Sequence, residues 1–237
     1  MTDETGKTAS AQAEAARQRG CGNCRVFNCE HLTGSFPEVC PTREVTGGPL
    51  LEATLNTYKQ PGPDADLARA AAEVEGQYYG LLTRVEETIA FARKLGVTRL
   101  GLASCVGLMQ ESRTLTKIFE LHGLTVKVVC CKIGAQDKVD IGLPDEVKVC
   151  PGQRESLCNP ILQAEYLNAW PSELNVMVGL CVGHDALFLR HAQAPTTILA
   201  AKDRVLGHNP LAAVYTSNFY YRRLMNPESG RLKDEKP

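Results

Sequence analysis

The sequence predicts an α/β fold: a Rossmann-like parallel sheet flanked by helices, with a small N-terminal four-cysteine metal-binding module. Two observations predict it. From about residue 99 onward, short apolar segments typical of strands alternate with segments of helical spacing, and such alternation is typical of a parallel sheet. Before that alternation begins, four cysteines fall within twenty residues, and this density indicates a metal site.

Length and composition set the domain organisation. The chain has 237 residues, of which 43% are hydrophobic, and this is enough for one sizeable α/β domain and a small appendage. Both ends of the chain are polar. We therefore expect a flexible tail at 1–20, the four-cysteine module and its linker at 21–60, the α/β domain at 61–225 and a second flexible tail at 226–237.

The charge balance excludes two classes of partner. Lys and Arg number 26 against 27 Asp and Glu, so we expect no nucleic acid and no anionic membrane as partner. No apolar run approaches the roughly 18 residues that a membrane span needs. The first twenty residues lack the apolar core of a signal peptide, so we expect a cytoplasmic protein. The sequence does not identify a small-molecule or redox partner or the oligomeric state.

Ten cysteines are many for a chain expected in a reducing compartment, where thiols stay free unless they bind metal or perform redox chemistry. The first four are Cys21, Cys24, Cys29 and Cys40. They begin with a Cys-x-x-Cys pair, and such a pair can bind one metal centre. Proline follows the last of them, as in sequences that bind four-iron clusters. The sequence therefore predicts either a 4Fe-4S cluster or zinc at these four cysteines.

The helices and strands of the α/β domain follow from apolar spacing. Apolar residues recur at steps of three and four from Leu67 to Ala92, and Gly96 follows, so we expect one long helix after Asp64. Four short apolar runs predict strands, at 99–103, 125–129, 176–180 and 196–200. Helical spacing predicts helices between about 107 and 122, at 161–169 and at 186–190, a short helix after Pro210, and a last helix at 215–224.

Reactive side chains follow every predicted strand. They are Cys105, Cys130, Cys131, Cys181, His184, Asp185, Lys202, Asp203 and Arg204, and Cys158 stands just before a predicted helix. The carboxyl ends of parallel strands share one edge of the sheet, where α/β proteins bind ligands. We therefore expect Cys105, Cys130, Cys131 and Cys158 to form a thiol-rich site with Cys181, while Cys150 falls outside it.

Three chemistries could use this edge. The thiols and His184 are soft ligands for a second metal. Thiolates at helix N-termini have lowered pKa values and exchange with disulfides. Cys181 could act as a catalytic nucleophile with His184 and Asp185, because Gly-Leu-Cys-Val-Gly matches the G-x-nucleophile-x-G elbow.

The elbow resembles that of class I glutamine amidotransferases over Gly179 to His184. Those enzymes need a later His-Pro-Glu type of pair, whereas this chain offers His208-Asn209-Pro210, which lacks the glutamate. The loop before it carries Lys202, Asp203 and Arg204, which together with His208 could bind an anionic ligand. A salt-bridged surface loop is the alternative for these four residues.

A longer resemblance covers nearly the whole chain. Its motifs are the early Cys-x-x-Cys, Leu-Ala-Ser-Cys-Val-Gly-Leu at 102–108, Cys-Cys-Lys at 130–132, Cys-Asn-Pro-Ile-Leu-Gln-Ala-Glu at 158–165, Gly-Leu-Cys-Val-Gly-His-Asp at 179–185 and Ala-Lys-Asp-Arg-Val-Leu-Gly-His-Asn-Pro at 201–210. These motifs resemble an uncharacterised family of cysteine-rich proteins, with a domain of unknown function, from archaea and anaerobic bacteria. The resemblance implies metal binding by the N-terminal cysteines and leaves the strand-end residues unassigned.

The sequence as a whole favours a metal-binding protein whose α/β domain carries a thiol-rich site with redox or second-metal chemistry. One alternative is a cysteine-dependent amidohydrolase or amidotransferase-like enzyme that uses Cys181. The other is a binding protein without catalysis, in which zinc only stabilises the N-terminal module. Whether the protein is an enzyme stays open at this stage.

Overall fold

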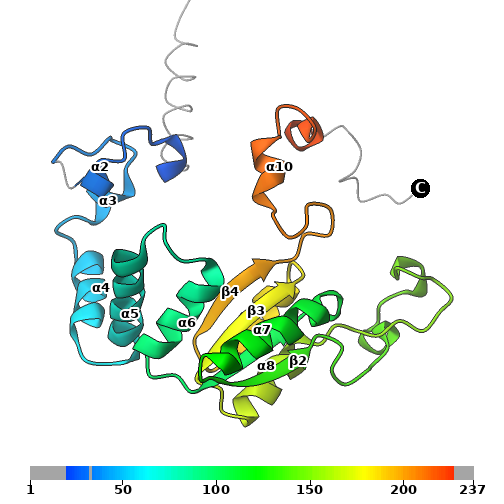
Figure 1. Ribbon diagram of the computed structural model, residues 1–237. Coiled ribbons are helices and arrows are strands. Elements are labelled where there is room, and N and C mark those ends of the chain that lie inside the picture. Colours follow the sequence, from blue (N-terminus) through cyan, green and yellow to red (C-terminus); the bar gives the residue numbers. More distant parts are fainter. Residues whose placement is uncertain (1–19, 32–33, 227–237) are drawn as a thin grey trace, which may run out of the picture. The chain divides into compact units, whose positions relative to one another are not determined.

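The computed structural model describes residues 20–31 and 34–226 (Figure 1). The chain divides into two compact units, Met1–Ala72 and Glu73–Pro237, and each is described by itself. The tails predicted at 1–20 and 226–237 lie, except for Gly20 and Asn226, outside the described residues. No helix in the described ranges is long and apolar enough to cross a membrane.

The first unit is helical. It contains the 3-10 helix η1 (Gly20–Asn23), then α2 (Asn28–His31), α3 (Pro41–Val45), α4 (Pro49–Lys59) and the beginning of α5 (Pro63–Tyr78). Helices α3, α4 and α5 each begin with proline, whose fixed φ suits the first helical position. The sequence interpretation assigned no element to 42–60. The signal for α4 was the prolyl residue after Gly47-Gly48, which begins the helix as well as marking a turn.

The single long helix predicted after Asp64 is wrong. Helix α5 ends at Tyr78, and a separate helix α6 (Arg84–Lys94) follows. Gly80 takes a left-handed φ of +69°, which stops the first helix. Thr83 and Glu86 then form a capping box, in which the Thr83 amide donates to the Glu86 carboxylate at 2.7 Å. The apolar residues keep their helical spacing across this break, so the spacing alone could not predict that the helix ends there.

A four-stranded parallel sheet forms the centre of the second unit. Its strands are β1 (Arg99–Ser104), β2 (Thr125–Cys130), β3 (Leu174–Leu180) and β4 (Thr196–Ala201), in the order β2-β1-β3-β4 (Figure 1). Every pairing is parallel. The prediction of an α/β fold with a parallel sheet flanked by helices is confirmed, and each predicted strand overlaps the observed one.

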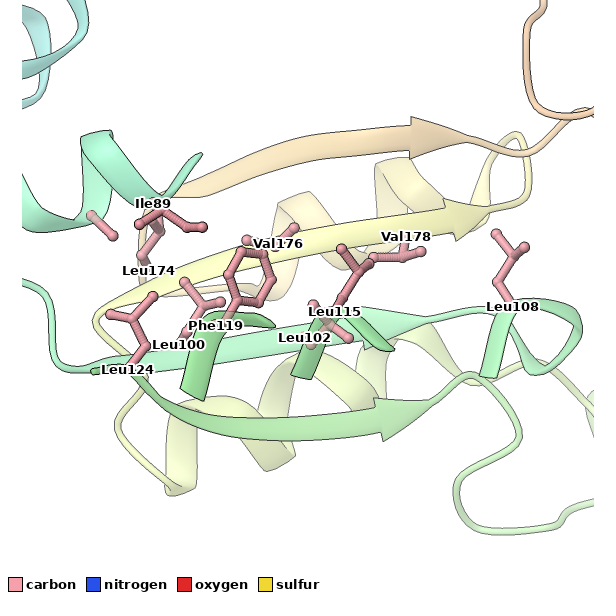
Figure 2. Close-up of a cluster of buried hydrophobic side chains, with 11 residues drawn as sticks. Ile89, Leu100, Leu102, Leu108, Leu115, Phe119, Leu124, Leu174, Val176 and Val178 are labelled. Atoms are coloured by element: carbon pink, nitrogen blue, oxygen red, sulfur yellow. The ribbon is translucent and has the colours of Figure 1, made fainter. Parts of the chain in front are cut away.

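Helices cover both faces of the sheet. On one face, Ile89 of α6 and Phe119 of α7 (Met109–Leu121) belong to one buried cluster with Leu102 and Val176 of the sheet; Figure 2 shows these side chains and their neighbours. On the other face, the helices are α8 (Pro160–Ala169) and α9 (His184–His191), which contribute Leu167 and Phe188 to a second cluster. The alternation of side chains along each strand produces these two cores.

A long loop connects β2 to α8. It contains the 3-10 helices η3 (Lys138–Ile141) and η4 (Asp145–Val147). Lys148 is buried in it, and its ammonium lies 2.9 Å from the Asp145 carboxylate and 3.5 Å from that of Asp137. An isolated antiparallel bridge pairs Asp137 with Ser156. The loop therefore folds back on itself and returns the chain to the end of β2.

The C-terminal segment differs from the prediction. The short helix after Pro210 is confirmed as α10 (Leu211–Tyr215), and the 3-10 helix η5 (Arg222–Met225) follows it. Another 3-10 helix, η2 (Val106–Leu108), connects β1 to α7. The last helix predicted at 215–224 is wrong, because turns occupy most of that range. Phe219 and Tyr220 are 75% and 86% exposed, so no burial of an apolar face stabilises a helix there.

Candidate thiol site at the carboxyl edge of the sheet

The strand order places a switch point between β1 and β3. From β1 the chain passes to β2 on one side, and β3 then pairs with β1 on the other side. Parallel sheets bind ligands outside the carboxyl ends of the two strands at such a point. Cys105 follows β1 and Cys181 follows β3, and the Cys105 amide donates to the Val178 carbonyl at 3.0 Å. Two predicted site residues therefore stand at the switch point.

Cys131 and Cys158 are brought together from positions 27 residues apart in sequence. Cys131 directly follows β2 and is buried. The Asn159 amide donates to the Cys131 carbonyl at 2.7 Å, and the Leu157 amide donates to the Gln136 carbonyl at 2.7 Å. These backbone bonds hold Cys158 beside Cys131, and the two thiol groups are hydrogen-bonded to each other.

The two thiols differ in pKa. The hydrogen bond from Cys131 lowers the pKa of Cys158 to about 5, with further help from the nearby Lys132 and His184. The same hydrogen bond, together with burial, raises the pKa of Cys131, although the Val106 amide donates to its sulfur at 3.3 Å and acts in the opposite direction. Because the cationic groups lie next to Cys158, we assign the thiolate to Cys158 and the proton to Cys131.

Cys105 and Cys130 lie beside this pair. Cys105 is buried, packs in the same cluster as Cys131 and Cys158, and interacts electrostatically with Cys131. Cys130 ends β2, is half-buried, and its sulfur accepts a hydrogen bond from the Lys132 amide at 3.5 Å. The four thiols predicted to share this edge therefore occupy one region of the second unit, whereas Cys150 is exposed on the long loop.

Lys132 is a residue of the site that the sequence interpretation did not single out. It follows the Cys130-Cys131 pair, its ammonium donates to the Ser156 carbonyl, and it also hydrogen-bonds Cys158. The available signal was a cation placed directly after two adjacent thiols at a strand end. The importance of this lysine could not be recognised from the sequence, because the sequence does not show that the loop brings Cys158 next to Lys132.

Cys181 has a different set of partners. The Arg204 guanidinium donates to its sulfur at 2.9 Å, and the Cys181 carbonyl accepts from the His184 and Asp185 amides. Gly179 and Gly183 have φ of +64° and +83°. Within the described ranges, no hydrogen bond joins the Cys181 sulfur to the side chain of His184 or Asp185, and the Asp185 carboxylate accepts from the Ala186 amide. A Cys-His-Asp relay is therefore not assembled in this geometry.

The loop after β4 divides its charged residues between two roles. The Asp203 carboxylate accepts from the Val205 and Leu206 amides at 2.9 and 2.8 Å. The Asp203 amide donates to His208 Nδ1 at 3.1 Å, so Asp203 and His208 hold the turn together. Lys202 and Arg204 extend from that turn: Arg204 reaches Cys181, and the Lys202 ammonium lies near Gly107 and Gly179.

The N-terminal cysteines have another environment. Cys21 and Cys29 are exposed, Cys24 is half-buried, and Cys40 is buried. The Cys24 amide donates to the Cys21 carbonyl at 3.0 Å, and a hydrogen bond from Thr42 lowers the pKa of the Cys40 thiol. Four thiols suit zinc or a four-iron cluster as donors. Among residues 20–31 and 34–226, however, no three His, Cys, Asp or Glu side chains are gathered closely enough to hold a metal ion.

Comparison with known proteins gives a family without an assigned activity. A protein of Methanocaldococcus jannaschii described as uncharacterized is 38% identical over 188 residues, which are 79% of this chain and 94% of that protein. No solved structure matches the chain. The family described as "Protein of unknown function (DUF1847)" matches residues 40–199, a range that contains Cys40 and all the cysteines of the sheet edge. The chain therefore belongs to this family of proteins of unknown function.

Proposed function

We propose that this chain is a cytoplasmic metal-binding protein whose α/β unit performs thiol–disulfide exchange with Cys158 as nucleophile and Cys131 as second thiol. The observation that supports this proposal is the hydrogen bond between the two thiols, which accompanies a pKa of about 5 for Cys158. Cys158 also stands two residues before α8, and the N-terminus of a helix stabilises a nearby anion. A thiolate next to a protonated thiol is the arrangement that exchange requires.

The reaction transfers two electrons to a disulfide substrate. The Cys158 thiolate attacks one sulfur, so that a Cys158–substrate disulfide forms, the substrate S–S bond breaks, and one substrate thiolate leaves and takes a proton from water. Cys131 then loses its proton to solvent and attacks the Cys158 sulfur. The Cys131–Cys158 disulfide forms as the second substrate thiol leaves. A cellular dithiol reductant would return the pair to the reduced state by the reverse exchange.

The test is selective alkylation at pH 6. A thiol with a pKa of about 5 is mostly ionised there, whereas a thiol of ordinary pKa near 8.5 is ionised to less than about one percent. The lower nucleophilicity of the weaker base offsets part of this difference. We expect Cys158 to react with iodoacetamide about tenfold faster than the exposed Cys150 in the same molecule, as measured by peptide mass spectrometry.

Two variants complete the design. After treatment with a small disulfide, a peptide map of the wild type should contain a Cys131–Cys158 disulfide, and Cys131→Ser should stop at the mixed disulfide on Cys158. Cys150→Ser serves as the control, because Cys150 is exposed and outside the site. Equal alkylation of Cys158 and Cys150 at pH 6 would contradict the proposal.

Metal binding by Cys21, Cys24, Cys29 and Cys40 is the other part of the proposal. It is supported by their donor type and by a spacing that begins with Cys-x-x-Cys. Small sites of this kind often form only when the metal binds, and this is consistent with thiols that stand apart in the first unit. Zinc would stabilise the module, and a 4Fe-4S cluster would supply electron transfer.

A second candidate function uses Cys181 as the nucleophile of an amidohydrolase or amidotransferase-like reaction. The observation in its favour is the Arg204 guanidinium at 2.9 Å from the Cys181 sulfur, because a positioned cation activates a cysteine. The Cys181→Ala and Cys158→Ser variants separate the two functions when both are tested with an electrophilic thiol probe. Loss of labelling in Cys181→Ala alone would favour this second candidate.

A further inference from the structure

The Lys202 ammonium stands inside the switch point between β1 and β3. A Cβ atom added to Gly107, in the turn after β1, would lie 3.4 Å from Lys202 Nζ and 3.9 Å from Cys105 Sγ. A Cβ atom added to Gly179, near the end of β3, would lie 3.9 Å from the same Nζ. The ammonium is therefore positioned over two glycines, beside a thiol of the site, at the place where parallel sheets bind ligands.

No carboxylate in the described ranges pairs with this ammonium. The Lys202 amide donates to the Leu180 carbonyl at 3.2 Å, and the Lys202 side chain makes no ion pair or hydrogen bond with residues 20–31 or 34–226. The neighbouring Asp203 carboxylate is occupied by two loop amides. A half-buried lysine without a counter-ion favours an anionic partner, because burial penalises an uncompensated charge.

The charged side chains that interact directly with Cys158 and Cys181 are also cationic. Lys132 and His184 lie next to Cys158, and Arg204 donates to Cys181. The Asp185 carboxylate accepts from a backbone amide at the start of α9. Positive groups on several elements thus surround the thiol-rich edge, and they attract a negatively charged ligand.

Gly107 leaves room for that ligand. Gly107 is exposed, and its backbone takes an ordinary φ, so glycine is not needed there for the conformation of the turn. A side chain at this position would instead stand against the ammonium and the Cys105 sulfur. The absence of a side chain therefore keeps the space above Lys202 and Cys105 open.

We propose that Lys202 binds the oxyanion of a small disulfide or thiol substrate, either a carboxylate or a phosphate group, between the turn at Gly107 and the end of β3. This inference rests on the proposed function, because the thiol pair at the same edge is what would react with such a substrate. Lys202 acts as a binding residue that holds the charged end of the substrate while the disulfide meets Cys158.

Binding is tested without any reaction of the thiols. Thermal unfolding is followed with increasing inorganic phosphate or malonate, at an ionic strength held constant with chloride. A ligand that binds only the folded state raises the midpoint. We expect one of the two anions to raise the midpoint of the wild type and of Lys117→Met, which removes an exposed charge on α7, but not that of Lys202→Met. Stabilisation by phosphate assigns a phosphate group, and stabilisation by malonate assigns a carboxylate.

Substrate preference is tested with two disulfides. Cys158 is allowed to react with an anionic bis(carboxyaryl) disulfide or with a neutral dipyridyl disulfide, and its peptide is quantified after quenching. Lys202→Met should lower the rate with the anionic reagent about tenfold, as expected for the loss of one close charge interaction of about 1.4 kcal/mol, and the rate with the neutral reagent less than about twofold. Gly107→Ala should produce a smaller loss with the charge retained, because its methyl group would contact the ammonium and occupy part of the space that the anion needs.

The outcomes separate this inference from the proposed function. A wild-type Cys158 that reacts slowly with both disulfides contradicts the exchange chemistry, and anion binding by Lys202 is then decided by the unfolding measurement alone. A wild type that reacts rapidly, together with equal anion effects in wild type and Lys202→Met, overturns the role of Lys202 and leaves the thiol pair intact.

Discussion

The two groups of cysteines in this chain show how differently thiols can be held. Around the sheet edge, Cys105 and Cys131 are buried, and Cys131 and Cys158 are hydrogen-bonded under the influence of nearby cations. In the first unit, Cys21 and Cys29 are exposed, and the described residues gather no ligand set. The parallel sheet orders the thiols at its edge through its own backbone bonds, whereas the short helices of the first unit do not gather three of their described thiols in one place.

This contrast has a consequence for metal dependence. The environment of the edge thiols is built from β1, β2 and the returning loop, all within Glu73–Pro237. In the function proposed above, a bound metal is what holds the N-terminal thiols in a fixed arrangement. Removal of that metal should therefore change one group of cysteines and leave the other unchanged.

Metal content should show the largest effect. We expect protein purified anaerobically to contain about one zinc ion or one four-iron cluster per chain, and the double variant Cys21→Ser with Cys24→Ser to contain none, because both thiolates of the Cys-x-x-Cys pair are lost. Metal analysis measures the content, and an absorption band at ~400 nm, with sulfide present, distinguishes the cluster from zinc.

The edge variant Cys105→Ser is the matched control and should retain the full metal content. Alkylation of Cys158 at pH 6 should be unchanged in the double variant. If the double variant keeps its metal and the edge variant loses it, the metal site lies at the sheet edge, and the contrast between the two groups of cysteines is reversed.

The packing of the edge should show the next largest effect. Gly179 has φ of +64°, and a Cβ atom there would overlap Leu108 Cδ1. Strain of about 1–2 kcal/mol for a left-handed residue and a similar cost of overpacking predict that Gly179→Ala lowers the free energy of unfolding by about 3 kcal/mol. Urea unfolding measures the loss.

The control for this variant is Gly123→Ala, at φ of +88° with no atom within 4 Å of the added Cβ. It carries the strain without the overlap, so a loss of about 1–2 kcal/mol is expected. An equal loss in the two variants would mean that Leu108 moves aside and that the edge is less tightly packed than its burial indicates.

The regular part of the fold could be predicted from the sequence because it depends on local patterns. The apolar runs that end at Ala103 and Leu180 predict buried strands with little ambiguity, and the alternation with helices predicts their parallel arrangement. The break between α5 and α6 was missed because the apolar spacing passes through it. Thr83 and Glu86 stand three residues apart and form a capping box, which predicts the start of a new helix. With Gly80 just before it, this signal indicates a helix boundary even where the apolar spacing continues.

The sequence could predict where the site lies in the fold but not which of its thiols pair. Topology alone places the residues after each strand at one edge, and Cys105, Cys131 and Cys181 accordingly lie there. The pairing of Cys131 with Cys158 depends on a loop of more than twenty residues that closes through Asn159 and through the bridge at Asp137. Such closure results from nonlocal bonds, which no spacing in the sequence encodes.

Removal of the neighbouring thiol should show the smallest effect and tests the feature that most distinguishes the edge. Because the hydrogen bond from Cys131 is the largest cause of the lowered pKa of Cys158, Cys131→Ala should move the midpoint of the pH profile of Cys158 alkylation upward from about 5. The rate falls as pH drops through this midpoint, so the fold loss is greatest below about pH 5 and shrinks as pH rises, to about fourfold at pH 8 for a midpoint restored to about 8.5. Cys131→Ser keeps a hydrogen-bond donor and should retain most of the low midpoint. An unchanged midpoint in Cys131→Ala would mean that the charges of Lys132 and His184 alone lower the pKa of Cys158. The neighbouring thiol would then have no part in stabilising the thiolate.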